Sequence, residues 1–239
     1  MIDITNNSEI DEKALTAKVD RLVRKFEHEK GALSFKSPAD PMAGLVNTLL
    51  SHNTTDKNRD RAYASLIEKY PTWEEVHKAP VEELAGIIRV AGLNRQKAER
   101  LKGLLGYLKD TQGAYSVDFL REMNFDQAVD ALGHLKGIGF KTLAVVMCFN
   151  LGVDVFPVDT HVHRLSKRLG LVPEKYDAVK TFKALRPRIP AEKSYQFHLH
   201  LIQYGREICH ARKPECGKCF VKDECPYYLK HIALNTSGV

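Results

Sequence analysis

The feature that most constrains this chain is a group of four cysteines near its C-terminal end. They follow the pattern Cys209-x6-Cys216-x2-Cys219-x5-Cys225, with Pro226 directly after the last. Four thiolates on one short, turn-rich segment can close around a single centre, and soft sulfur ligands select iron–sulfur clusters or zinc. Zinc commonly uses two separated Cys-x2-Cys pairs, whereas this segment has one such pair between two longer arms. The spacing therefore favours an iron–sulfur cluster, with zinc as the alternative.

The fifth cysteine and the N-terminal segment bear on where the protein works. Cys148 lies within the apolar stretch LAVVMCFNL, which indicates a buried small hydrophobe and not a metal ligand. No apolar run approaches the roughly 18 residues of a membrane span. The opening MIDITNNSEIDE is too polar and acidic for a signal or transit peptide. We therefore expect a cytoplasmic protein that binds no membrane and whose cysteines form no structural disulfides.

Positive charge is concentrated in the last third of the chain. Residues 159–239 carry 15 Lys and Arg against 8 Asp and Glu, a net charge of +7, whereas residues 1–158 carry 21 against 22. A basic lobe on a near-neutral body suits a polyanionic partner, because phosphate contacts give sequence-independent affinity. Lys213 and Lys218, in the cysteine segment, are candidate phosphate contacts, and a merely solvated basic surface is the alternative.

Apolar residues recur at helical spacing along most of the chain. One such series is Leu15, Val19, Leu22, Val23 and Phe26, and others occur at 84–88 and 101–108. Pro and Gly interrupt these series, and no alternating strand pattern or solenoid repeat competes with them. The sequence therefore predicts an all-α fold, long enough at 239 residues for two lobes. Trp73 and Val76 are expected in its core.

The segment LGHLKGIGFKT at 132–142 predicts the end of one helix, a tight turn and the start of the next. Gly137 and Gly139 allow positive φ and close backbone approach at the turn. Exposed amides and the following helix N-terminus can bind a DNA phosphate, because several donors there lack internal partners. Lys136, Gly137, Ile138 and Gly139 are therefore candidate DNA contacts.

Two residues at predicted helix starts carry candidate chemistry. Lys141 lies in the first turn after the glycines, where the helix dipole disfavours a cation and favours the neutral, nucleophilic amine. Asp159, within PVDTHVHR, can stabilise positive charge that develops on a sugar ring. The structural alternatives are a surface lysine and an N-cap acid. Thr160 can cap the same helix, and His161 is assigned no catalytic step.

Taken together, these segments resemble a known family. LKGIGFKTLAVV at 135–146, PVDTHVHR at 157–164 and the cysteine pattern have the order and spacing of the helix–hairpin–helix DNA glycosylase superfamily, in its endonuclease III branch. The likeness extends upstream to LSHNTTD at 50–56 and GLNRQKA at 92–98.

The resemblance covers about residues 15–228 and implies two all-helical lobes with double-stranded DNA bound across the cleft. Residues 34–153 are expected to form a six-helix barrel that contains the helix–hairpin–helix. Residues 1–33 and 154–239 are expected to form a cluster lobe built from both chain ends. The four clustered cysteines would hold a 4Fe–4S cluster, and we expect a monomer.

The resemblance also implies an activity: a base-excision repair DNA glycosylase and abasic-site lyase that removes oxidised pyrimidines. The damaged nucleotide would be rotated out of the duplex. Lys141 would attack C1′ and expel the base, while Asp159 would activate the lysine and stabilise the oxocarbenium-like state. The resulting Schiff base would permit β-elimination, which nicks the strand at a damaged base or an abasic site.

Further DNA contacts follow from the same resemblance. Asn53 aligns with a family glutamine that fills the space left by the extruded base, with His52 beside it, and Leu93 aligns with a second wedge residue. Asn53 is shorter than the family residue. Lys136 and Phe140 stand where Pro and Arg are usual, so the hairpin also departs from the pattern.

Two other functions remain open from the sequence. One is a non-catalytic, metal-stabilised DNA-binding protein that uses the hairpin only as a phosphate clamp. The other is a monofunctional mismatch or adenine glycosylase, although relatives of that kind generally lack a lysine at the position of Lys141. The lysine and aspartate together favour the bifunctional enzyme.

Overall fold

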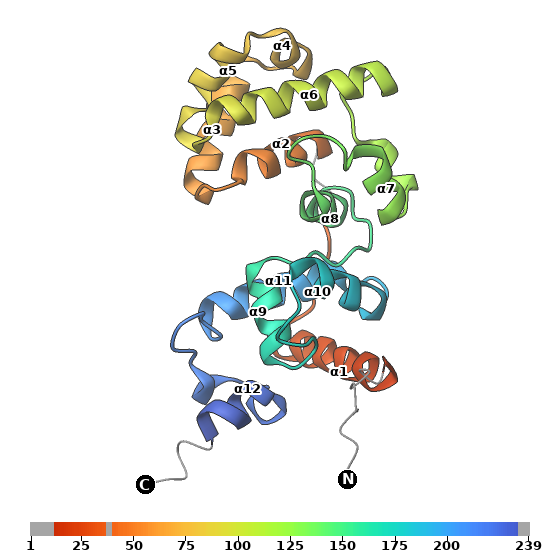
Figure 1. The fold of residues 1–239 in the computed structure, drawn as a ribbon, viewed down its shortest axis with the longest axis vertical. Coiled ribbons are helices and arrows are strands. Elements are labelled where there is room, and N and C mark those ends of the chain that lie inside the picture. The colour runs from red at the N-terminus through yellow and green to blue at the C-terminus, as the bar shows by residue number, and fades with distance from the viewer. Residues whose placement is uncertain (1–11, 37–39, 234–239) are drawn as a thin grey trace, which may run out of the picture. The chain divides into compact units, whose positions relative to one another are not determined.

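The computed structural model describes residues 12–36 and 40–233, and within these ranges the chain is helical and contains no strand. The helices fall into two compact units (Figure 1). One unit is Phe35–Val155, and the other joins the segment through Ser34 to the segment from Phe156 onward. Each unit is described by itself below.

The unit Phe35–Val155 is built from seven α-helices and two 3-10 helices. They are α2 (Pro41–Ser51), α3 (Asp56–Lys69), α4 (Trp73–Lys78), α5 (Val81–Ile87), η1 (Arg89–Ala91), α6 (Asn94–Gln112), η2 (Asp118–Glu122), α7 (Phe125–Leu132) and α8 (Phe140–Phe149). The long α6 lies against α5, α4 and α2, and α8 packs on α2 and α7 (Figure 1).

The core of this unit follows the helical spacing of its apolar residues. Leu101, Leu104, Leu105 and Leu108 are each at most 1% exposed, because they share the face of α6 that packs against neighbouring helices. Helix α8 is apolar on most of its surface and is buried along most of its length. Fully burying a leucine stabilises the fold by roughly 1.5–3 kcal/mol, so these two helices provide the frame that positions the loops around them.

Local capping fixes where several of these helices begin. Thr72 and Glu75 form a capping box at α4, and the Asp40 carboxylate accepts the amide of Met42 at the start of α2. Asp40 also accepts a hydrogen bond from the indole of Trp73, at 3.0 Å. The expectation that Trp73 lies in the core is therefore wrong, because its indole N–H reaches an exposed carboxylate and the ring stays partly exposed.

The second unit combines both ends of the chain. Its elements are α1 (Glu12–Lys30), α9 (Thr160–Arg168), α10 (Ala178–Leu185), η3 (Arg186–Arg188), α11 (Ser194–Glu207), η4 (Cys216–Lys218), η5 (Lys222–Glu224), α12 (Pro226–Tyr228) and the π-helical turn η6 (Leu229–Ala233). Helix α11 packs against both α1 and α9 (Figure 1).

An aromatic cluster joins α1 to the C-terminal segments of this unit. The ring of Phe26 on α1 lies edge-on to Phe197 and Tyr204 of α11 and to Phe220 of the cysteine segment, with centroid separations of 5.8, 5.1 and 4.9 Å. Edge-to-face pairs of this kind add about 0.5–1.5 kcal/mol each beyond the area they bury. The N-terminal helix is therefore an integral part of the unit that holds the cysteines.

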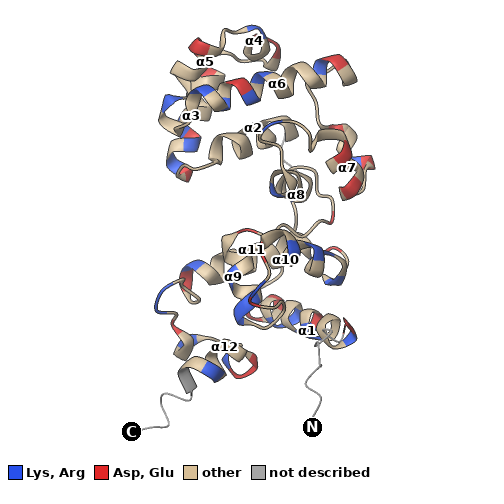
Figure 2. Ribbon diagram, in the orientation of Figure 1, with Lys and Arg blue, Asp and Glu red and all other residues tan. Residues whose placement is uncertain are grey.

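Charged residues are distributed unevenly over the helices. Lys and Arg alternate with Asp and Glu on α3 and α6, whereas α7 carries acidic residues (Figure 2).

None of the described helices combines the length and the apolar character that crossing a bilayer requires.

Candidate DNA-binding and catalytic site

The predicted hairpin between α7 and α8 has the expected backbone at its first glycine. Gly137 adopts φ +90°, and a Cβ at this position would lie 2.6 Å from the side chain of Arg100. Only glycine tolerates both the left-handed conformation and this close approach. Gly139 differs from expectation: it has φ −89° and serves as the N-cap of α8, where no side-chain cap is present.

Ile138 is a correction to the predicted DNA contacts. Its side chain is 1% exposed and packs in the core, and its amide donates to the carbonyl of Leu135 at 3.0 Å. Neither group is available to a phosphate. The amides of Gly137 and Gly139 donate no hydrogen bond within the described chain, and the exposed Lys136 lies between Leu135 and Gly137. The anion-binding capacity of the hairpin therefore rests on its glycine amides and Lys136.

Lys141 is the second residue of α8 and its side chain is exposed. It borders a cavity of about 660 Å³ that lies wholly within the unit Phe35–Val155. The lining residues come from α2 and its following loop, α3, α6 and α8: Gly44, Asn47, Thr48, Ser51, His52, Asn53, Arg59, Gln96, Arg100, Lys141, Thr142, Val145, Phe149 and Asn150. Small-molecule sites typically occupy 300–1,000 Å³, so this cavity has room for an extruded nucleotide.

The cavity is electropositive on the side of Lys141. The pKa of His52 is lowered, chiefly by burial and then by the neighbouring cations Arg100, Lys97 and Lys141. No acidic residue lines the cavity within the described chain. An imidazole kept neutral among three cations marks a region where an anion is favoured, which is the electrostatic requirement for a site that takes a phosphodiester.

The two predicted wedge residues both occupy strained, exposed positions. Asn53 has φ +54° in the loop after α2, and Leu93 has φ +47° as the residue before α6. Leu93 is one of the exposed large hydrophobic residues, with 50% of its surface accessible. A non-glycine residue with positive φ costs of order 1–3 kcal/mol and persists only where the surroundings enforce it. Asn53 and His52 also line the cavity.

Sequence reasoning missed several residues of this site. Arg100 lies against the hairpin glycine and also borders the cavity, and Arg59, Gln96 and Asn47 line the same space. Arg100 lies seven residues after the Gly-Leu loop at 92–93, on the helix that begins after that loop, and this position is the one sequence signal that could have identified it. The others have no motif, because their proximity depends on how α2, α3 and α6 pack.

Asp159 lies in the other unit, at the start of α9. It is the N-cap residue, and its Oδ1 accepts the amide of Val162 at 2.7 Å. Its second carboxylate oxygen accepts no hydrogen bond from the described residues. Asp159 therefore caps α9, as the structural alternative holds, and its second carboxylate oxygen stays available to a ligand. Thr160 is the first helical residue and not the cap, which corrects the expectation for it.

His161 is a packing residue of this unit. A Cβ on Gly205 of α11 would lie 2.7 Å from its Nδ1, so only glycine lets α9 and α11 approach this closely. Burial is the main cause that lowers the His161 pKa. Arg164 donates to the carbonyls of Gly205 and Cys209, which ties the same helix to the cysteine segment.

The four predicted metal ligands border one apolar cavity in this unit. Among residues 12–36 and 40–233, no three His, Cys, Asp or Glu side chains are placed to hold a single metal ion. The four cysteines share one space whose other lining residues are mainly apolar or aromatic. This donor set fits an iron–sulfur cluster, which brings its own bridging sulfides.

Neighbouring residues support the cluster site. Arg168 donates to the sulfur of Cys209 at 3.2 Å and to the carbonyl of His210 at 2.7 Å, while its guanidinium stacks on Tyr227 at 4.5 Å. Glu224, between the last two cysteines, pairs with Arg21 and with Lys25 of α1. The cysteine segment is thus held to α9 and α1 by charged contacts.

The two lysines predicted to contact phosphate from this segment differ in their surroundings. Lys213 is exposed and has φ +50°. Lys218 is also exposed, and its amine pairs with Glu215 at 2.6 Å. A surface pair of this type is worth at most about 1 kcal/mol, so a phosphate can replace the glutamate. Both residues stay predictions as DNA contacts.

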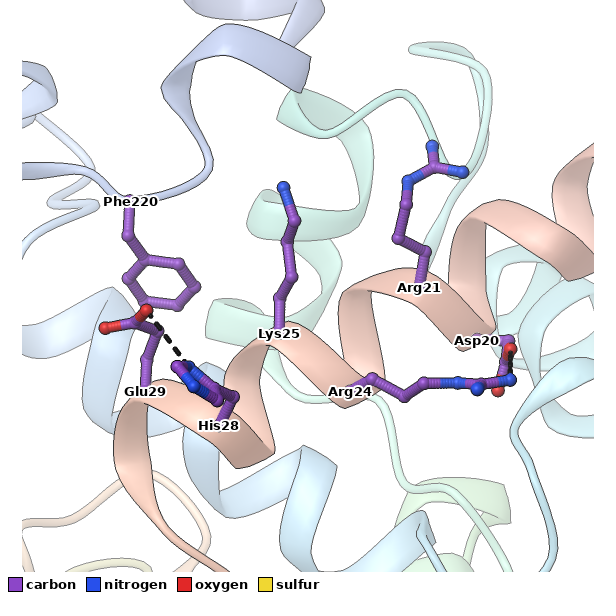
Figure 3. A pocket seen from close by; sticks show the side chains of 7 residues that line it. All are labelled: Asp20, Arg21, Arg24, Lys25, His28, Glu29 and Phe220. Atoms are coloured by element: carbon purple, nitrogen blue, oxygen red, sulfur yellow. Dashed lines mark hydrogen bonds and ion pairs between the residues drawn. The ribbon is translucent and has the colours of Figure 1, made fainter.

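A second hollow lies along α1, over the side chains drawn in Figure 3. Its lining residues are Asp20, Arg21, Arg24, Lys25, His28, Glu29 and Phe220. The cations there are already paired, Arg24 with Asp20 (Figure 3) and both Arg21 and Lys25 with Glu224, and the His28 imidazole lies 3.4 Å from the Glu29 carboxylate. This charge balance separates it from the cavity beside Lys141, and we assign it no ligand.

The comparisons with known proteins agree with this geometry. Residues 46–191 match the HhH-GPD superfamily of base excision DNA repair proteins. Residues 209–225, which begin and end at the first and last clustered cysteines, match the iron–sulfur binding domain of endonuclease III. The chain therefore belongs to the helix–hairpin–helix superfamily of base-excision DNA glycosylases. Within it, the chain is of the endonuclease III type and carries a 4Fe–4S cluster.

Two curated relatives illustrate the relationship. A protein of Arabidopsis thaliana named as a DNA glycosylase is 38% identical over 187 residues, which are 77% of this chain and 64% of that protein. Endonuclease III of Thermotoga maritima is 35% identical over 191 residues, which are 80% of this chain and 85% of that protein. The chain thus spans less than two thirds of the plant relative and most of the bacterial one.

Solved structures show the same fold. A non-covalent endonuclease III–DNA complex and a trapped endonuclease III–DNA covalent intermediate each have 30% sequence identity, with TM-scores of 0.75 and 0.74. They cover 90% and 92% of this chain and 97% of their own chains. A thermostable thymine-DNA glycosylase is 27% identical with a TM-score of 0.73, covering 92% of this chain and 97% of its own. These likenesses support DNA as the ligand.

Proposed function

We propose that this protein is a bifunctional DNA glycosylase and abasic-site lyase that removes oxidised pyrimidines from duplex DNA. One observation carries the proposal: the exposed amine of Lys141, on the first turn of a helix, borders an electropositive cavity of about 660 Å³. A lysine at such a site can act as a nucleophile toward a sugar carbon. The likeness to a trapped covalent endonuclease III–DNA intermediate supports the same chemistry.

The proposed reaction uses Lys141 twice. Its nitrogen lone pair forms a bond to C1′ of the extruded nucleotide, and the electrons of the glycosidic bond leave with the base, which takes up a proton. The attached nitrogen gives up one proton, the C1′–O4′ bond breaks as the nitrogen lone pair forms the C1′=N bond, and O4′ takes up a proton, which leaves a protonated Schiff base. Loss of a C2′ proton then expels the 3′ phosphate, and water releases the nicked product and restores the amine.

Asp159 is proposed to stabilise the positive charge that develops on the sugar and to accept a proton from Lys141. Its N-cap bond to Val162 fixes the carboxylate in one orientation, and its second oxygen stays available. A fixed carboxylate aimed at developing charge needs no reorganisation during the reaction, which is the main source of such electrostatic stabilisation. The aspartate therefore has a structural and a chemical role in the proposal.

We further propose double-stranded DNA with a damaged base or abasic site as the partner, bound by a monomer. The glycine amides of the hairpin, Lys136 and the neighbouring Arg100 supply groups that can bind phosphate. Because such contacts release counterions, affinity should fall steeply with salt concentration.

Borohydride trapping tests the proposal most directly. The purified protein is incubated with duplex DNA containing thymine glycol or an abasic site, and borohydride reduces any imine to a stable covalent adduct. We expect adducts with both substrates for the wild type and none for Lys141→Ala or Lys141→Arg. Asp159→Asn should bind DNA normally and form adducts far more slowly.

Other results would assign a different function. An adduct with the abasic site alone would support the lyase activity and would reject oxidised pyrimidines as the substrate. Release of free base without an adduct would indicate a monofunctional glycosylase, a possibility that the likeness to a thymine-DNA glycosylase raises. DNA binding without base release and without an adduct would indicate a non-catalytic DNA-binding protein that uses the hairpin only to hold phosphate.

A further inference from the structure

Lys97 is a buried lysine that no part of the proposed reaction uses. It lies in the first turn of α6, and 2% of its surface is exposed. Its ammonium donates to two backbone carbonyls, those of Leu50 and Ala91, each at 2.8 Å. Burial lowers its pKa, as does the nearby Arg100. Burying an ammonium group is costly unless strong hydrogen bonds compensate, so this contact must stabilise something specific.

The two carbonyls belong to segments that lead into the wedge positions. Leu50 is at the end of α2, three residues before Asn53, and Ala91 ends η1, two residues before Leu93. Both wedge positions have positive φ and are exposed. One charged group therefore joins two loops that are far apart in sequence, immediately upstream of their strained tips. Charge-assisted hydrogen bonds are roughly twice as strong as neutral ones.

We propose that Lys97 is a positioning residue that holds the Asn53 and Leu93 loops as one rigid unit, so that both side chains enter the duplex together when a nucleotide is extruded. The inference rests on the proposed function, because removal of a base by Lys141 requires the nucleotide to leave the duplex, and the two loops are proposed to fill the space that it leaves. An exposed leucine held in a strained conformation suits insertion between bases. Rigid presentation avoids ordering two separate loops during binding.

The test uses a readout that requires no chemistry. A duplex carries a tetrahydrofuran abasic analogue opposite 2-aminopurine, whose fluorescence rises when a wedge unstacks it, and the rise is followed by stopped flow. Lys97→Met removes the donors and keeps the volume. We expect its rate of rise to fall about tenfold or more, from the loss of two charge-assisted bonds, while DNA affinity measured by anisotropy changes by less than about twofold.

The same helix offers a matched control. Lys102 donates to the carbonyls of His77 and Ala79, each at 2.5 Å, so it makes the same kind of two-carbonyl contact away from the wedge loops. Lys102→Met should therefore leave the fluorescence rise unchanged. An equal slowing in both variants would mean that Lys97 only stabilises α6, and would overturn the proposal.

A combination of variants tests whether Lys97 acts through the wedge. In an Asn53→Ala, Leu93→Ala double background, Lys97→Met should change the rate by less than about twofold, because both side chains that it positions are gone. A full tenfold effect in that background would contradict the inference.

If the circular dichroism of Lys97→Met shows that helix is lost, the test uses Asn53→Ala, Leu93→Ala and the double variant instead. Both residues are exposed, so neither substitution disturbs the core. Their effects on the rate should be strongly non-additive if the loops act together, and additive effects would reject the inference. A wild-type protein that opens the duplex but excises nothing would refute the proposed function and leave this inference standing.

Discussion

The hydroxyl of Thr142 lies 3.4 Å from Nε2 of His52 and donates to the carbonyl of Gly137 at 3.3 Å. Because the hydroxyl proton goes to the glycine carbonyl, His52 must donate from Nε2 in this arrangement. The residue next to Lys141 thus connects the hairpin turn to the loop that follows α2. The buried side chain of Thr142 thus contacts both the turn proposed to bind phosphate and the loop of one proposed wedge residue, next to the proposed nucleophile.

Thr142→Val should weaken this connection without changing side-chain volume. The Gly137 carbonyl and His52 would lose their partner in a mostly buried place, which costs about 1–3 kcal/mol. Chemical denaturation should show that loss in the free energy of unfolding, and Thr142→Ser should restore most of it. A valine variant as stable as the wild type would mean that the hydroxyl contributes nothing to the connection.

DNA binding should take up a proton at His52. In the free protein burial and three cations lower the pKa of His52 below its ordinary value of 6.5. A DNA phosphate at the cavity favours the protonated form and raises that pKa, so affinity should increase as the pH falls toward the lowered pKa of the free protein. Anisotropy titrations with an uncleavable abasic analogue should show this dependence in the wild type. It should disappear in His52→Gln and persist in His77→Gln, whose imidazole bonds Tyr115 instead.

Cys148 should be inert in the folded protein. It is 1% exposed, and burial raises the pKa of its thiol from 9.0 to about 12. Since the folded state holds the proton more tightly than the unfolded state, the stability this thiol contributes is complete below pH 9 and is lost as the pH rises toward 12.

That loss can reach about 1.4 kcal/mol per pH unit. Denaturation at several pH values should show a steeper decline above pH 9 in the wild type than in Cys148→Ala. Iodoacetamide should label Cys148 only after unfolding. Rapid labelling of the native protein would show that the thiol is accessible.

Asp40→Ala should release both the start of α2 and the indole of Trp73. The N-cap bond to Met42 is worth about 1–2 kcal/mol, and the unfolding free energy should fall by that amount. Because Trp73 is the one tryptophan in the sequence, its emission should shift as the 3.0 Å contact is lost. Asp177→Ala removes a comparable N-cap at α10 and should leave the emission unchanged.

Cys216→Ala should remove the cluster and loosen the segment that carries it. Between residues 209 and 228 this segment has only short helical turns, and Val221 and Cys225 are its buried residues. A segment with so little core depends on the metal centre for its folding free energy. Iron content should fall to near zero and proteases should cut the segment, whereas Cys148→Ala should retain its iron. Full iron content in Cys216→Ala would exclude this cysteine as a ligand.

Much of the fold could be predicted from local patterns. The spacing of Leu101, Leu104, Leu105 and Leu108 identifies a helix with one buried face because side-chain direction repeats every 3.6 residues. The glycine at position 137 could be predicted for the same local reason, since a left-handed turn excludes side chains. Ile138 shows the limit: its motif places it in the turn, and only packing shows that both its side chain and its amide are used internally.

The sequence by itself determined the helical class, the four cysteine ligands and the candidate pair Lys141 and Asp159, because those features depend on spacing over a few turns of chain. The tertiary structure alone decided that Arg100 reaches Gly137 and that Lys97 binds Leu50 and Ala91. These contacts join residues six to 47 positions apart through the packing of α2 and α6 and the hairpin before α8. No local sequence pattern predicts these contacts, because they depend on how many buried side chains pack together and not on any one of them.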